Sequence, residues 1–181
     1  MITILLISIG LAMDAFAISI SSGLTIKKLK VQNAFKIALF FGGFQAIMPV
    51  LGWISGISIK NYIAGIDHWI AFGILSVIGI KMIYESVKIE KEKNKMNILN
   101  TKVLFILAVA TSIDAFAVGV SFVFLSVAII KPAVIIGIIT FIMSFTGVFI
   151  GERIGHLFED KIEIVGGLIL IGIGIKILLT L

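Results

Sequence analysis

The stretch that decides the fold is Ala12-Met13-Asp14-Ala15-Phe16-Ala17, which reappears as Ser112-Ile113-Asp114-Ala115-Phe116-Ala117 at an offset of 100 residues. Each copy lies near the middle of a long apolar run. An ionised aspartate at the centre of a bilayer costs about 2.5 to 3.5 kcal/mol on insertion scales, so membrane segments retain one only for a reason. Two aspartates at matching positions therefore predict an internal repeat with a functional carboxylate in each copy.

The composition around these motifs is that of a membrane protein. The chain is 60% hydrophobic and only 14% charged, with a mean hydropathy of +1.22. About 20 apolar residues are needed for one helical crossing of the bilayer. We predict an all-α integral membrane protein with six transmembrane helices, the first a retained span without a basic leader or cleavage site. They cover approximately residues 3–24, 34–56, 68–86, 103–125, 132–151 and 162–181.

The repeat divides the chain into two halves of three spans within a single membrane domain. Residues 1–86 form the first three-helix repeat, 87–102 a polar cytoplasmic linker loop, and 103–181 the second repeat. Gly52-Trp53-Ile54-Ser55-Gly56 is matched to Gly151-Glu152-Arg153-Ile154-Gly155, and Gly79-Ile80-Lys81 to Gly174-Ile175-Lys176. Because each half has an odd number of spans, the second repeat is inverted, as in many secondary transporters.

The positive charge is concentrated in alternate loops. Cytoplasmic loops of membrane proteins carry an excess of lysine and arginine, so these loops are expected inside and both termini outside the cytoplasm. The same distribution explains the net charge of +5 as a membrane-surface effect and disfavours nucleic-acid binding. The odd loops and their flanks hold Lys27, Lys28, Lys30, Lys36, Lys88, Lys91, Lys93, Lys95, Lys102, Arg153 and Lys161, whereas the even loops hold Lys60 and Lys131.

The two aspartates are the strongest candidates for chemistry. With no cysteine in the chain, a metal site must use oxygen, imidazole or thioether ligands. We expect Asp14 and Asp114 to face each other and jointly neutralise a divalent cation. The alternative is that each is protonated or hydrogen-bonded to a neighbouring helix and serves only packing.

Gln45 is the third expected metal ligand. It precedes Pro49 by four residues, and a proline removes the helical hydrogen bond to the carbonyl four residues back. Gln45 would then offer both a side-chain amide and a main-chain oxygen, although a simple helix kink explains the pair equally well. Supporting roles are expected for the residues near the site, which are Thr111, Ser21, Ser121, Pro49, Ser144 and Met48. Of these, Met48 could offer a thioether, although methionine more often fills gaps in the packing than binds a metal.

The remaining charged residues inside the apolar runs lie near their ends. A gate or coupling role is possible for them, and anchoring at the membrane surface is the favoured interpretation. They are Lys81, Glu85, Glu163 and Lys176.

The chain as a whole resembles the bacterial manganese efflux pump family, MntP, within the lysine-exporter-like superfamily. The resemblance is carried by the two aspartate motifs, by Gly43-Phe44-Gln45-Ala46-Ile47-Met48-Pro49 and by His68-Trp69-Ile70-Ala71-Phe72. It implies a six-helix exporter of Mn²⁺ in the bacterial plasma membrane, with aspartates matching Asp14 and Asp114 needed for transport. It also implies that some relatives carry an acidic residue at the position of Gln45.

These observations predict a secondary transporter that exports Mn²⁺ by alternating access, with other divalent cations as alternative substrates. Mn²⁺ is the transported substrate and no cofactor is expected; protons are a possible counter-ion, since emptied carboxylates close together tend to take up a proton. The sequence contains no nucleotide-binding P-loop, so direct coupling to ATP is disfavoured.

Two alternatives stay open. One is export of another cation or of a small amino compound by the same architecture. The other is an intramembrane aspartyl protease, because two membrane aspartates can also activate water. Neither Asp14 nor Asp114 has a Gly-x-Gly-Asp context, so we expect that the chain is not an enzyme.

Overall fold

The computed structural model describes residues 2–26, 30–60, 69, 72–74, 76–78, 80, 99–154, 171 and 175. In this part of the chain the fold is all-α, with the long helices α1 (Ile2–Thr25), α2 (Val31–Lys60), α4 (Thr101–Phe124) and α5 (Ile130–Ile154). Each is long and apolar enough to cross a bilayer. The expected first, second, fourth and fifth spans are thereby confirmed as long apolar helices.

The other two expected spans stay predictions, because 68–86 is described only at 69, 72–74, 76–78 and 80, and 162–181 only at 171 and 175. So do the roles expected of residues within them: Lys81, Glu85, Glu163 and Lys176.

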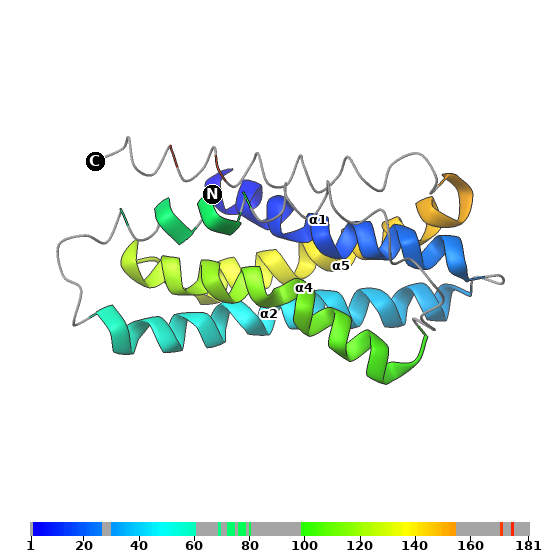
Figure 1. Ribbon diagram of the computed structural model, residues 1–181, viewed down its shortest axis with the longest axis horizontal. Coiled ribbons are helices and arrows are strands. Elements are labelled where there is room, and N and C mark those ends of the chain that lie inside the picture. Colours follow the sequence, from blue (N-terminus) through cyan, green and yellow to red (C-terminus); the bar gives the residue numbers. More distant parts are fainter. Residues whose placement is uncertain are drawn as a thin grey trace.

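The four helices form two pairs (Figure 1). Helix α1 packs mainly on α5, and the two run in the same direction. Helix α2 packs on α4, and this pair runs the opposite way; α2 also packs on α5. By contrast, α1 makes only slight contact with α2 and with α4. Helices from the first half of the chain are therefore interleaved with helices from the second half.

Glycines allow the backbones within each pair to approach closely. A Cβ atom built on Gly52 or Gly119 would collide with the main-chain oxygen of Phe116 or Pro49, respectively, across the interface of α2 and α4. Between α1 and α5, a Cβ on Gly151 would collide with the main-chain oxygen of Ile20. Small residues of this kind are a common basis of helix association in lipid, where helices cannot gain from hydrophobic burial against each other.

The two pairs meet where α2 crosses α5, at Gly42 and Gly137. A Cβ on Gly42 would lie 2.8 Å from the main-chain oxygen of Gly137, and a Cβ on Gly137 would lie 3.0 Å from that of Gly42. The contact is thus reciprocal, and neither position has room for a side chain.

Large apolar side chains form exposed stripes on the outside of the bundle. On α5 the exposed residues recur every fourth position, and α2 has a similar stripe near its start. Such stripes are unfavourable in water and expected where a helix faces lipid. These residues are Ile130, Val134, Ile138 and Ile142 on α5, and Val31, Phe35 and Leu39 on α2.

Side chains also tie the ends of the bundle together. Lys36 near the start of α2 donates hydrogen bonds to the Leu99 carbonyl (3.1 Å) and the Thr101 hydroxyl (2.9 Å), at the start of α4. At the opposite end, the Trp53 indole N–H donates to the carbonyl of Val127 (3.2 Å), in the connection between α4 and α5.

Candidate metal centre

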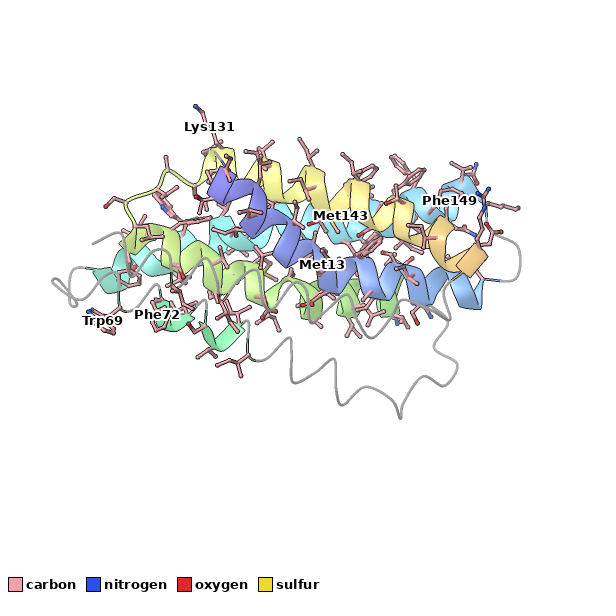
Figure 2. All side chains as sticks on the ribbon, turned by 90° about the horizontal axis from the view of Figure 1, so that it is seen from above. Met13, Trp69, Phe72, Lys131, Met143 and Phe149 are labelled. Carbon is pink, nitrogen blue, oxygen red and sulfur yellow. The ribbon has the colours of Figure 1, made fainter. Side chains whose placement is uncertain are left out.

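The two aspartates lie near the middle of their helices. Asp14 on α1 is half-buried, and Asp114 on α4 is 5% exposed. Their neighbourhood can be followed in Figure 2 from Met13 on α1 and Met143 on α5, which both lie midway along the bundle. Both positions are continuous α-helix, so each carboxylate is held on a regular scaffold.

Gln45 on α2 joins the two helices that carry the aspartates. Its side chain is fully buried, and its amide nitrogen Nε2 donates hydrogen bonds to the carbonyls of Leu11 (3.1 Å) and Thr111 (3.2 Å). Leu11 and Thr111 occupy matching places in the repeated motif, each three residues before its aspartate. A single amide group thus bridges equivalent turns of α1 and α4.

This bridge bears on where the carboxylates lie. Residues three apart share one face of a helix, and helical side chains lean back toward the N-terminus. Gln45 therefore contacts α1 on the face that carries Asp14. It contacts α4 on the face that carries Asp114. Gln45 holds these two faces together even though α1 and α4 touch each other only slightly.

Three buried oxygens of uncharged side chains near this level have no hydrogen-bond partner in the described part of the chain. They are Gln45 Oε1, Thr140 Oγ1 and Ser144 Oγ, each on a side chain that is 0% exposed. Leaving a buried polar atom unsatisfied costs about 1 to 3 kcal/mol. Each of these oxygens has lone pairs that can accept a hydrogen bond or coordinate a cation.

The remaining expected residues make ordinary local contacts. The hydroxyls of Thr111 and Ser121 donate to carbonyls of their own helix, at 3.0 Å to Leu107 and 3.1 Å to Ala117. The backbone of Pro49 lies against Gly119. Ser21 is half-buried on α1, and Met48 packs against the core cluster around Leu11 and Val118, which is the gap-filling role.

Comparison with known proteins supplies the class. The family described as "Mntp: Putative manganese efflux pump" matches residues 28–178, which is most of the chain. The chain belongs to this manganese efflux pump family. It is 56% identical to a protein named "Putative manganese efflux pump MntP" from Methanosarcina mazei, over 98% of this chain and 95% of the relative.

Other relatives agree with this membership. A protein of the same name from Clostridium botulinum strain Loch Maree is 53% identical over 98% of this chain and 93% of its own length. A protein of that name from Gloeothece citriformis is 54% identical over 98% of this chain and 94% of its own length. No solved structure matches the chain. Membership in a family of efflux pumps agrees with the expectation that the chain is a membrane transporter and not an enzyme.

The donor set fits the cargo of such a pump. The described residues contain no cluster of three or more histidine, aspartate or glutamate side chains that could hold a metal ion tightly. Two carboxylates supplemented by neutral oxygens instead match the charge of a divalent cation and its preference for oxygen ligands.

Thr140 was not among the residues expected from the sequence, and the structure adds it as a candidate because its hydroxyl is buried and has no partner among the described residues. It lies three residues after Gly137, as Gln45 lies three residues after Gly42. The shared spacing from a glycine was a usable signal, but it has meaning only once the two glycines are known to contact each other.

Proposed function

We propose that this protein is a secondary transporter that exports Mn²⁺ from the cytoplasm, with Asp14 and Asp114 binding the ion at the middle of the membrane. The observation that carries the proposal is the bridge from Gln45 to Leu11 and Thr111, because it ties the two aspartate-bearing faces to one buried amide. Membership in the manganese efflux pump family supports Mn²⁺ as the cargo.

The chemistry follows from the charges. Two carboxylates balance the two positive charges of Mn²⁺, so the occupied site is close to neutral and tolerable in a low-dielectric interior. Gln45 Oε1, which has no hydrogen-bond partner in the described segments, adds a neutral oxygen that replaces part of the hydration shell. The Nε2 bonds fix this amide in orientation, so its oxygen is positioned before the ion arrives.

The contacts between helices support the inverted repeat. Gly52 approaches Phe116, and Gly56 approaches Val120, on the interface of α2 and α4. On the interface of α1 and α5, Gly147 approaches Phe16 and Gly151 approaches Ile20. The two sets are related by offsets of 95 residues between α2 and α5 and 100 residues between α1 and α4.

The reciprocal contact of Gly42 with Gly137 has the same offset of 95 and is what a pseudo-twofold axis between them would produce. In this register Gly52 corresponds to Gly147 and Gly56 to Gly151. The sequence alone had matched Gly52 with Gly151 and Gly56 with Gly155, so the register differs by four residues. It agrees with the match between Gly79-Ile80-Lys81 and Gly174-Ile175-Lys176.

The packing also suggests which parts move in alternating access. A movement of one sequence half against the other would separate α1 from α5 and α2 from α4, the interfaces with the closest backbone contacts. We infer instead that α1 with α5 forms one unit and α2 with α4 the other. They would rock about the Gly42–Gly137 crossing and open the site alternately to either side.

The direction of transport rests on the orientation. The bundle end with Lys30, Lys36, Lys102 and Arg153 is placed in the cytoplasm by the positive-inside rule, and the end with Lys131 outside, in the plasma membrane. Labelling of single cysteines introduced at Lys102 and Lys131 with a membrane-impermeant reagent checks this orientation. Protons taken up by the emptied carboxylates are the proposed counter-ion.

Substitution of the aspartates tests the proposal. In a manganese-sensitive bacterial strain, Asp14→Asn and Asp114→Asn should each abolish rescue of growth and raise cellular manganese to the level of the empty vector. Glu152→Gln is the matched control, since Glu152 is exposed at the end of α5. If both aspartate variants rescue growth at normal protein levels, the proposal is wrong. Proteoliposomes with Mn²⁺, Mg²⁺, Fe²⁺ or Cd²⁺ identify the preferred ion.

A further inference from the structure

Two buried hydroxyls on α5 depart from the pattern of the other helices. Serine and threonine in these helices generally donate to a carbonyl three or four residues earlier, which is their usual way of satisfying the hydroxyl in a membrane helix. Thr140 and Ser144, one turn apart and fully buried, have no partner in the region that the structure describes. Those that follow the pattern are Ser8, Ser19, Ser22, Ser55, Thr111, Ser112, Ser121 and Thr146.

The contacts of α5 with α1 set the level of these hydroxyls. Gly151 packs at Ile20, and Gly147, one turn earlier, packs at Phe16 and Ser19. The two helices run in the same direction, so each further turn back on α5 corresponds to a turn back on α1. Ser144 therefore lies at the level of Asp14, and Thr140 at the level of Leu11.

The crossing of α2 and α5 gives the same placement from the other side. The two helices run in opposite directions, and a Cβ on Gly42 would meet Gly137 and Phe141, whereas a Cβ on Gly137 would meet Gly42 and Ala46. The turns 42–46 and 137–141 therefore lie side by side, and they contain Gln45 and Thr140. Gln45 reaches the Leu11 carbonyl, which is the level derived for Thr140 from α1. Two independent interfaces thus bring Thr140, Ser144 and the Gln45 amide to the turns that carry Asp14.

We propose that Thr140 and Ser144 are ligands of the transported ion and form the α5 wall of its site. This inference rests on the proposed function, because it takes Asp14 and Asp114 as the charged ligands. The two hydroxyl oxygens and Gln45 Oε1 replace water on the cation without adding charge. An all-oxygen set of this composition favours a hard or borderline ion such as Mn²⁺ over ions that prefer sulfur.

Removal of the hydroxyls tests the binding role. Thr140→Val with Ser144→Ala should weaken Mn²⁺ binding at least tenfold in the purified full-length protein, measured by calorimetry. The melting temperature should stay unchanged or rise, since no hydrogen bond of the described structure is lost. Thr146→Val is the control, because its exposed hydroxyl bonds its own helix. Thr140→Ser should bind Mn²⁺ like the unmodified protein.

A gain of function provides a second, direct readout. Ser144→Cys introduces the only thiol of the chain, and a thiolate ligand prefers Cd²⁺. This variant should bind Cd²⁺ at least tenfold more tightly than the unmodified protein and show the ultraviolet charge-transfer band of a cadmium–thiolate bond. Thr146→Cys should show no such band, and adding Asp14→Asn should abolish it.

The outcomes separate the two proposals. Unchanged Mn²⁺ affinity in the double variant, or no band with Ser144→Cys, overturns the role of the hydroxyls. A lower melting temperature of the double variant with unchanged Mn²⁺ affinity also overturns the ligand role and assigns the two hydroxyls to packing. If Asp14→Asn abolishes Mn²⁺ binding in these cases, the proposed function still stands. If the unmodified protein binds no Mn²⁺, both proposals fail.

Discussion

At the level of single residues, Gln45 bridges two helices and is also a proposed ligand of the ion. Its Nε2 group uses both of its hydrogens on carbonyls of different helices, and its buried Oε1 oxygen has no hydrogen-bond partner among the residues that the structure describes. The sequence predicted the ligand role because Gln45 is a polar residue in an apolar run. The bridging role could not be predicted, since nothing local connects residue 45 with residues 11 and 111.

Gln45→Leu separates these tasks from general packing. Leucine has a similar volume but makes neither bond, and each lost hydrogen bond contributes about 0.5 to 1.5 kcal/mol. We expect a melting temperature lower by several degrees in detergent, and loss of Mn²⁺ export in proteoliposomes. Gln32→Leu, at an exposed position near the start of α2, should change neither. Export at the normal rate by Gln45→Leu would contradict the proposed site.

At the level of elements, the helices are paired by glycines at a few positions. Their effect depends on what an added Cβ would meet: at Gly52 it would meet the backbone of Phe116, whereas at Gly43 on the same helix no other described segment lies within 4 Å of it. The sequence shows both as glycines in an apolar helix and cannot distinguish them, because the difference lies entirely in the neighbouring helix.

Alanine substitutions at these two positions should therefore act in opposite directions. Gly52→Ala forces α2 away from α4, and overpacking of this kind costs about 1 to 3 kcal/mol. Gly43→Ala adds no clash and stabilises the helix by roughly 0.5 to 1 kcal/mol. The melting temperature of the purified protein should fall for the first and stay or rise for the second. Equal shifts would mean that the close contact of Gly52 with Phe116 is absent.

At the level of the whole molecule, the interleaved helices distinguish two kinds of movement. Phe35 and Phe141 form an edge-to-face ring contact with centroids 5.6 Å apart, between the two proposed rocking units. Phe44 and Phe105 form a similar contact at 5.2 Å within the α2–α4 unit. Both contacts join the first half of the sequence to the second.

Cross-linking of cysteine pairs at these contacts tests which units move. The chain has no cysteine, so a short bifunctional thiol reagent joins only the introduced pair. Linking Phe35→Cys to Phe141→Cys should block Mn²⁺ transport in proteoliposomes, whereas linking Phe44→Cys to Phe105→Cys should leave it intact. Blockage by both links would favour movement of the sequence halves, and blockage by neither would contradict rocking at these interfaces.

Much of the architecture and of the site could be read from local properties of the chain. Four of the expected spans appear as helices within a few residues of their expected bounds, because lipid imposes a length and an apolar composition on every crossing. Asp14, Asp114 and Gln45 could be selected as candidates for the same reason, since a polar group in such a run is unfavourable without a partner or a function; their role as ligands stays a prediction.

The tertiary structure alone decided the partners: α1 with α5, α2 with α4, and the bridge from Gln45 to Leu11 and Thr111. In lipid all apolar helix faces are nearly equivalent, so the pairing depends on how small residues of two distant segments fit together. That fit is a property of two surfaces in contact and is absent from either segment by itself.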